Sequence, residues 1–181
     1  MLRPDQANEV EGELSLLRRR RAWKEVVAKP AVGINAAGSM RSALEDPSLA
    51  HHPAGLLQTG DALIQLFLRS ILSEGELSLI FVDSVFTHAV RKRPRLGDCR
   101  VQDNHGGSVQ PCQPSERELA VASAALACAP SPTTYACVDL AYVDDAPAVM
   151  ELELVEPELF LRFSPAATAA LARAVLVATA A

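Results

Sequence analysis

ELSLIFVDSVFTHAVRK, residues 76–92, has the pattern of a two-stranded β-hairpin. Apolar and polar residues alternate in its first half, which predicts one strand face with Leu77, Leu79 and Phe81 and another with Glu76, Ser78 and Ile80. Asp83-Ser84 fills a two-residue turn, where serine is less favourable than glycine because such turns need positive φ. The returning strand is predicted to carry four side chains on one face: Phe86, His88, Val90 and Lys92.

Outward from this hairpin, the sequence predicts further strands at residues 25–32, 62–68, 135–143 and 148–154. The last two form an antiparallel pair around a turn at 144–147. Ser115 and Glu118 form a capping box that begins a helix to residue 129, and Ser164 before Pro165 begins a final helix through residue 180. Residues 14–23 predict a short solvated helix, 46–58 a loop or helix, and 33–39 and 94–107 loops. The mixed order indicates an α+β fold dominated by antiparallel pairs.

The composition is that of a folded, soluble chain. Its 181 residues are 49% apolar and 22% charged, which excludes intrinsic disorder. The net charge of −5 argues against nucleic-acid and membrane-surface partners. The polar start at residues 1–12 predicts no signal peptide. The Ala-rich stretch 166–181 is too short to span a bilayer. The four cysteines form no CxxC pair, so their spacing suggests neither a zinc site nor a redox motif. We therefore expect a cytoplasmic protein.

Three carboxylates are predicted to meet on one face of the last strand pair. Glu151 and Glu153 are two residues apart and point to the same side of a strand, and pairing across the turn brings Asp139 opposite them. Carboxylates this close repel each other unless a cation lies between them, and all-oxygen ligation suits Mg²⁺. The alternative is a solvated acidic face on an edge strand.

Basic residues beside glycines predict phosphate contacts. Lys29 lies near the end of an apolar strand, before the small-residue loop GINAAGS at 33–39. A lysine point charge with nearby backbone N–H groups suits a phosphate, although a lysine that only extends to solvent fits the pattern as well. Arg100, followed by Gly106-Gly107, could reach a phosphoryl group, or could belong to a charged loop without a ligand.

The order of these motifs resembles the ATP-grasp superfamily, in its glutathione-synthetase-like branch, and within it the cyclo-ligases that close the D-cycloserine ring. The resemblance runs from about residue 26 to 175 and is carried by VVAKPAV, GINAAGS, LIQLFL, EGELSL, GDCRVQDNHGG, VDL and MELELVEPELFL. It implies an ATP-grasp fold with two α/β lobes whose antiparallel sheets clasp a nucleotide site. It also implies that residues 26–181 are the nucleotide-binding core and C-terminal lobe, after an Arg-rich segment at 1–25.

The resemblance assigns roles to individual residues. Lys29 would contact the ATP phosphates, and Glu76 the ribose hydroxyls. Arg100 would face the transferred phosphate with Lys92 nearby, as the catalytic pair. The adenine would be received by a hinge of three residues, Gln65, Leu66 and Phe67. The metal, Mg²⁺ or in its place Mn²⁺, would be held by Asp139, Glu151 and Glu153.

The implied activity is that of an ATP- and Mg²⁺-dependent carboxylate–amine ligase or cyclo-ligase that acts through an acyl-phosphate. Its substrates would be a small carboxylate and an amine, and a separate subunit could supply the N-terminal subdomain that relatives carry and this chain lacks. Cys137 in place of the usual Arg, together with the expected absence of the N-terminal subdomain, keeps an alternative open: a non-catalytic nucleotide-binding or degenerate ATP-grasp module. Two further departures, Cys99 for Phe and Ser84 for Gly, would loosen packing and the hairpin.

Overall fold

The hairpin predicted at residues 76–92 is present in the computed structural model, which describes residues 1–20, 22–33, 36–95 and 106–180. Strands β4 (Glu76–Val82) and β5 (Val85–Arg93) pair antiparallel. Asp83 and Ser84 both have positive φ, 48° and 63°, as a two-residue hairpin turn requires. The turn therefore forms even though neither residue is glycine.

One face assignment in this hairpin was wrong, because β5 contains a β-bulge. Ile80 pairs with His88 but Phe81 pairs with Phe86, so that Thr87 is an extra residue in β5. The Thr87 hydroxyl donates a 3.0 Å hydrogen bond to the carbonyl oxygen of Ile80. Phe86 consequently packs on the same face as Phe81, with ring centroids 5.9 Å apart, and does not share a face with Val90.

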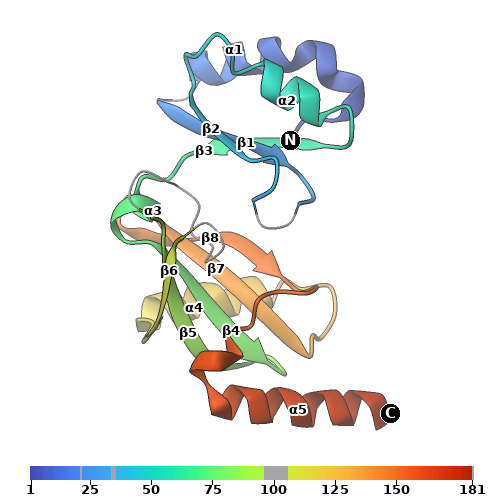
Figure 1. Cartoon of the computed structure of the whole chain (residues 1–181), viewed down its shortest axis with the longest axis vertical. Coiled ribbons are helices and arrows are strands. Elements are labelled where there is room, and N and C mark those ends of the chain that lie inside the picture. The colour runs from blue at the N-terminus through green and yellow to red at the C-terminus, as the bar shows by residue number, and fades with distance from the viewer. Residues whose placement is uncertain (21, 34–35, 96–105, 181) are drawn as a thin grey trace. The chain divides into compact units, whose positions relative to one another are not determined.

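The hairpin is the centre of a five-stranded antiparallel sheet of order β6-β5-β4-β7-β8 (Figure 1). The other strands are β6 (Ser108–Cys112), β7 (Tyr135–Val143) and β8 (Ala146–Glu153). β8 begins two residues earlier than expected, because Asp144 and Asp145 form a second turn with positive φ. The sequence pattern missed β6, whose Pro111 is compatible with a strand because β6 lies at the sheet edge.

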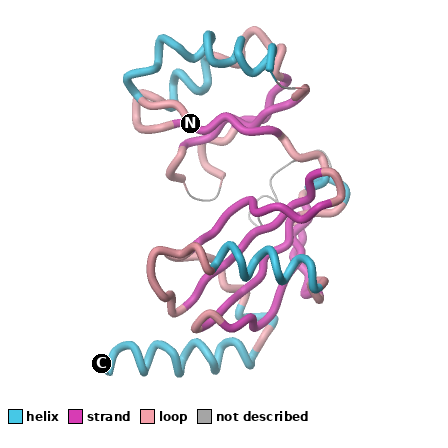
Figure 2. The backbone as a smooth tube through the Cα atoms, turned by 180° about the vertical axis from the view of Figure 1, so that it is seen from behind, coloured by secondary structure: helices cyan, strands magenta, loops and turns pink. Residues whose placement is uncertain are grey.

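Helices cover both faces of this sheet. On one face, α4 (Glu116–Leu126) packs on the alternating apolar residues of β4 and β7, and Figure 2 shows it lying across the strands. Its predicted capping box is present: the Glu118 N–H donates to the Ser115 hydroxyl, and the Ser115 N–H to the Glu118 carboxylate. On the other face, Ile80, Val90 and Cys137 contact Phe160.

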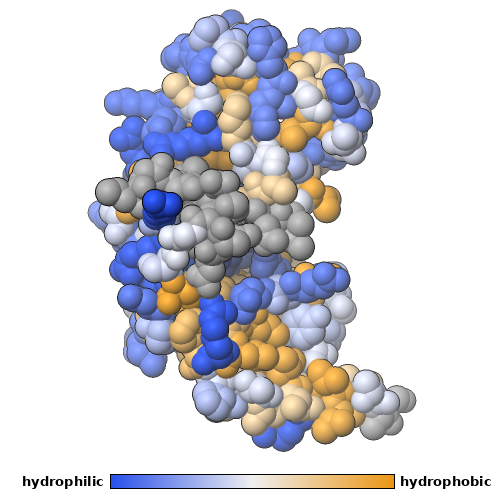
Figure 3. Space-filling model, in the orientation of Figure 1, coloured by the Kyte–Doolittle hydropathy of each residue, from blue (hydrophilic) through white to orange (hydrophobic). Residues whose placement is uncertain are grey.

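The predicted final helix is α5 (Pro165–Ala180), and the Ser164 hydroxyl accepts a hydrogen bond from the Ala167 N–H. Helix α5 packs beside β4 and β5 and buries Ala167 and Ala174. Its last turns carry three exposed apolar side chains, Val175, Leu176 and Val177, and Figure 3 shows hydrophobic surface on this helix. Two short elements complete this part of the chain, α3 (Ser70–Ser73) and the 3₁₀ helix η3 (Leu161–Phe163).

The first 67 residues form a separate unit around a three-stranded antiparallel sheet of order β2-β1-β3 (Figure 1). Its strands are β1 (Glu25–Pro30), β2 (Met40–Ala43) and β3 (Ala62–Leu66); β2 was not predicted. Its helices are the 3₁₀ helix η1 (Pro4–Glu9), α1 (Val10–Arg20) and α2 (His51–Leu56). Helices α1 and α2 lie on one face of the sheet.

The expectation of a solvated N-terminal helix was wrong. Val10 and Leu14 of α1 are buried and, with Leu2, pack in one core with Val26 of β1. Their spacing places them one turn apart on one helix face, which explains why that face is buried. The second unit is Leu68–Ala181. Among the described residues, no helix combines the length and the apolar character needed to cross a membrane.

Candidate functional site

The centre of the candidate site is Asp139, a carboxylate that is almost fully buried in the five-stranded sheet. Only 3% of its surface is exposed. Its Oδ1 accepts a 2.6 Å hydrogen bond from the hydroxyl of Ser78, the residue opposite it on β4. Its Oδ2 lies 2.8 Å from Nζ of Lys92 on β5. Neighbouring strands therefore converge on this carboxylate and fix its orientation.

Lys92 joins Asp139 to a second carboxylate. Its Nζ also lies 2.5 Å from Oε1 of Glu76, its cross-strand partner. Burial disfavours the charged ammonium, but the Asp139 and Glu76 carboxylates outweigh this effect and raise the pKa of Lys92. Burial would also raise the pKa of Asp139, yet the Lys92 charge lowers it. Lys92 and Asp139 thus form a buried ion pair.

The ionised form of Glu76 is disfavoured in this arrangement. Burial and the negative charge of Asp139 raise its pKa to about 7, despite the attraction of Lys92. One ammonium therefore serves two buried carboxylates, and the cluster has more acidic than basic groups. A further cation near these carboxylates would relieve their repulsion.

The edge strand β8 contributes two further glutamates near Asp139. The register pairs Asp139 with Glu151 and Cys137 with Glu153, which confirms the strand pairing predicted from the sequence. The Cys137 thiol, an Asp139 oxygen and a Glu153 oxygen lie within 4.8 Å of one another. Burial, Asp139 and Glu151 together raise the pKa of Glu153. Glu151 itself is exposed and does not belong to this close group.

The carboxylate donors in this cluster suit a hard divalent cation. Asp139 and Glu153 offer oxygen atoms of the kind that Mg²⁺ binds, and Glu151 lies on the same strand face. The Cys137 thiol is a soft donor that Mg²⁺ does not select. The alternative of a solvated acidic face describes the exposed Glu151 but not Asp139, which is buried.

In the first unit, Lys29 and Gln65 lie on one face of the sheet and Leu66 on the other. Val26 and Ala28 of β1 point into the core under the helices, so that Lys29 and Val27 lie on the opposite face. Gln65 pairs with Val27 and shares that face, whereas Leu66 pairs with Val26. Within the described residues, Lys29 makes no ion pair.

Phe67 ends the first unit and is only 5% exposed. The guanidinium of Arg41 lies 3.9 Å from the centroid of its ring, and Arg41 also forms an ion pair with Glu25. The Phe67 N–H donates to the Glu25 carbonyl oxygen, which continues the β1–β3 pairing by one residue. The second unit begins with the next residue, Leu68.

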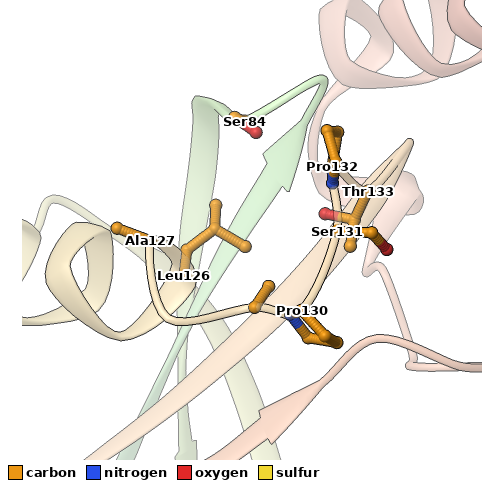
Figure 4. A pocket seen from close by; sticks show the side chains of 8 residues that line it. Ser84, Leu126, Ala127, Pro130, Ser131, Pro132 and Thr133 are labelled. Carbon is orange, nitrogen blue, oxygen red and sulfur yellow. The ribbon is translucent and has the colours of Figure 1, made fainter.

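Two other observations define the limits of the site. Arg100 and Cys99 lie outside the described residues. An open pocket of about 330 Å³ lies between the β4–β5 turn and the segment after α4, lined by Ser84, Leu126 and residues 127 and 129–133 (Figure 4). It contains none of the predicted site residues.

Two residues of the cluster were not predicted as site residues. Ser78 could have been found, because it lies on the Glu76 face of an otherwise apolar strand. Cys137 could also have been found, because strand alternation places it on the Asp139 face, and in the structure its Sγ lies 3.5 Å from Oδ1.

Comparisons with known proteins find similar chains and structures, although no protein-family model matches the sequence. The chain is 34% identical over 152 residues to the cycloserine biosynthesis protein DcsG of Streptomyces lavendulae, which covers 78% of this chain and 50% of that protein. The crystal structure of D-cycloserine synthetase DcsG superimposes with a TM-score of 0.79 at 29% identity, over 96% of this chain and 62% of that one.

Two more distant structures share the fold. A D-alanine–D-alanine ligase from Bacillus anthracis, complexed with ATP, gives a TM-score of 0.59 at 16% identity, over 84% of this chain and 51% of that one. The ATP-grasp ligase PsnB, complexed with a minimal precursor, Mg and ADP, gives 0.54 at 17% identity, over 92% and 51%. The chain spans about half the length of the curated relative that it matches.

Proposed function

We propose that this ATP-grasp protein binds Mg-ATP and transfers the terminal phosphate to a small carboxylate, which an amine then attacks. The observation that carries this proposal is the buried Lys92–Asp139 pair with Glu76 and Glu153 beside it, in a fold shared with DcsG. A cluster with an excess of buried carboxylates is suited to a cation and its anionic ligand.

The first unit would contribute nucleotide contacts. Lys29, whose ammonium has no carboxylate partner among the described residues, would contact the α- and β-phosphates. Gln65, Leu66 and Phe67 would receive the adenine at the hinge, and the position of the unit boundary directly after Phe67 supports that role. In the second unit, Glu76 would bind the ribose hydroxyls, and residues 26–181 as a whole would form the nucleotide-binding core and C-terminal lobe.

The second unit would also contribute the groups that act on the transferred phosphate. Asp139, Glu151 and Glu153 would hold the Mg²⁺, or Mn²⁺, and the ion would neutralise charge on the phosphate oxygens. Lys92 holds Asp139 in place through its ion pair and, with Arg100, would stabilise negative charge on the phosphoryl group. Positioning and charge neutralisation supply most of the catalysis in this class of reaction.

The acyl-phosphate formed in this step would react with the amine, so that the C–O bond to phosphate breaks and a C–N bond forms. The activity would be that of a carboxylate–amine ligase or cyclo-ligase, in the cytoplasm.

A second function, a nucleotide-binding module without catalysis, is favoured by one observation. Cys137 lies against Asp139 at a position where the resemblance implies an arginine. Loss of one donor to a developing oxyanion costs about 10²–10³ in rate. Such a chain would bind Mg-ATP but turn it over slowly.

Calorimetric titration with Mg-ATP tests the proposal. We expect micromolar, Mg²⁺-dependent binding that is lost in the Glu151→Gln/Glu153→Gln double variant and retained in Glu156→Gln, an exposed glutamate control on the same chain. No binding by the folded wild-type chain would overturn both functions. Binding without phosphate release, and release restored by Cys137→Arg, would favour the non-catalytic module.

A further inference from the structure

The strand register brings a thiol into the carboxylate cluster, although the spacing of the cysteines along the sequence predicts no metal site. Cys137 is 1% exposed and lies two residues before Asp139, on the same face of β7. Glu153 is its cross-strand partner on β8. One sulfur and two carboxylate oxygens, from Cys137, Asp139 and Glu153, lie within 4.8 Å of one another.

The contacts of Asp139 leave room for another ligand bond. Lys92 binds Oδ2, whereas Oδ1 accepts from the Ser78 hydroxyl at 2.6 Å and lies 3.5 Å from the Cys137 Sγ. A carboxylate has about four lone-pair positions, so Oδ1 can bind a cation between itself and the Cys137 Sγ while it still accepts from the Ser78 hydroxyl.

The net negative charge of the cluster also favours binding of a divalent cation. Its three carboxylates, Glu76, Asp139 and Glu153, and its one ammonium, Lys92, leave a net charge of −2 when all are ionised. Burial of Asp139 and Lys92 limits screening by solvent, so the repulsion among the carboxylates is not dispersed into water. A bound M²⁺, together with the thiolate that forms when it binds, reduces this charge from −2 to −1.

We propose that Cys137, Asp139 and Glu153 bind a thiophilic divalent cation of the zinc class. Thiolate is a soft ligand that favours zinc over Mg²⁺, whereas carboxylates alone favour Mg²⁺, Ca²⁺ or Mn²⁺. On binding, the S–H bond of Cys137 breaks, its proton goes to the buffer and a metal–sulfur bond forms, with no change of oxidation state. The site uses two carboxylates of the proposed Mg²⁺ site, but it does not rest on nucleotide binding.

Titration of Co²⁺, a spectroscopic substitute for zinc, into the metal-free full chain without nucleotide tests this proposal. We expect a thiolate-to-cobalt charge-transfer band in the ultraviolet that saturates at one equivalent and is removed by added Zn²⁺ but not by equimolar Mg²⁺. Heat measured in buffers of different ionisation enthalpy should show release of one proton per bound ion.

Three variants identify the donors. Cys137→Ser should lose the band and at least about tenfold in Zn²⁺ affinity, since changes even to groups that only support metal ligands cost 10–100-fold. Glu153→Gln keeps the thiol and should weaken Zn²⁺ binding while the chain stays folded. Cys128→Ser, at an exposed cysteine outside the cluster, should behave as wild type.

A folded wild-type chain that gives no band would overturn the proposal. So would a band that persists in Cys137→Ser or disappears in Cys128→Ser. Because no nucleotide is present, these outcomes are distinct from a failure to bind Mg-ATP. If Cys137→Ser does not fold, the Glu153→Gln titration decides, and an unchanged Zn²⁺ affinity there overturns the site.

Discussion

Two neighbouring cations of β5, Arg91 and Lys92, enter ion-pair clusters on opposite faces of the five-stranded sheet. Arg91 lies 3.1 Å from Glu118 of α4, whose carboxylate also accepts a 2.7 Å hydrogen bond from the Tyr142 hydroxyl and one from the Ser115 N–H. Burial would raise the pKa of Glu118, but these donors lower it. In this cluster the Arg91 guanidinium and the Glu118 carboxylate balance each other.

The Lys92 face is arranged differently. Its one ammonium faces Glu76 and Asp139, and burial with the charge of Asp139 raises the pKa of Glu76 to about 7. The balanced Arg91 cluster ties α4 to the sheet, as a structural network does. An excess of buried carboxylate is a feature of sites that bind cations, because perturbed ionisation without full compensation tends to accompany function.

Removing the cation of the second cluster should have the largest effect. Lys92→Met leaves Asp139 and Glu76 buried without a counter-charge, so the free energy of unfolding should fall by about 3–5 kcal/mol. Urea denaturation measures this loss, and the exposed Lys24→Met is the matched control, expected within about 0.5 kcal/mol of wild type. A loss below about 1 kcal/mol would contradict the buried ion pair.

Removing the anion of the first cluster should have a smaller effect on stability and none on ligands. Glu118→Gln weakens the contact to Arg91 and the helix cap, and we expect a loss of about 2–3 kcal/mol in the free energy of unfolding. The control is the exposed Glu116→Gln in the same helical turn. Mg-ATP affinity, measured by calorimetry at a temperature where the variant is folded, should be unchanged; a lost affinity would place Glu118 in the functional site.

The smallest effect should appear as a pH dependence. The pKa of Glu76 is raised from 4.5 to about 7, so between these values the folded chain keeps a proton that the unfolded chain has released. This contribution makes the stability of the wild type fall as pH rises from about 5 to 8. Glu76→Gln removes the fall, and between pH 6 and 8 the difference in unfolding free energy between the two proteins should change by about 1–1.5 kcal/mol. Parallel curves in urea melts at pH 5, 6, 7 and 8 would refute the raised pKa.

Several features were predictable because local chemistry determines them. The capping box Ser115–Glu118 uses side chains three residues apart. The pairing of Asp139 with Glu151 was predicted, but it depends on an irregularity between Asp139 and Leu140, because uninterrupted pairing from the Val143–Ala146 pair would place Asp139 opposite Met150. The ATP-grasp fold followed from the order of the motifs, and the likeness to DcsG and the other ATP-grasp structures supports it.

Other features depend on contacts that a sequence pattern does not contain. The buried face of α1 is defined by β1, and the short β6 is a strand only because β5 pairs with it. The thiol of Cys137 belongs to the cluster through its cross-strand neighbour Glu153. Such positions are fixed by tertiary packing, which overrides weak local preferences.

The extra residue in β5, Thr87, shifts by one residue the alternation of side chains between the two faces of the strand. If pairing ran without interruption from the Val82–Val85 pair, Glu76 would lie opposite Arg91, and Lys92 would point toward α4. Thr87 delays the alternation by one step, so that the lysine and not the arginine reaches the acidic face. A single residue, Thr87, thus decides which of two adjacent cations pairs with the carboxylates, although it lies four to five residues, about 13–17 Å, away along the strand.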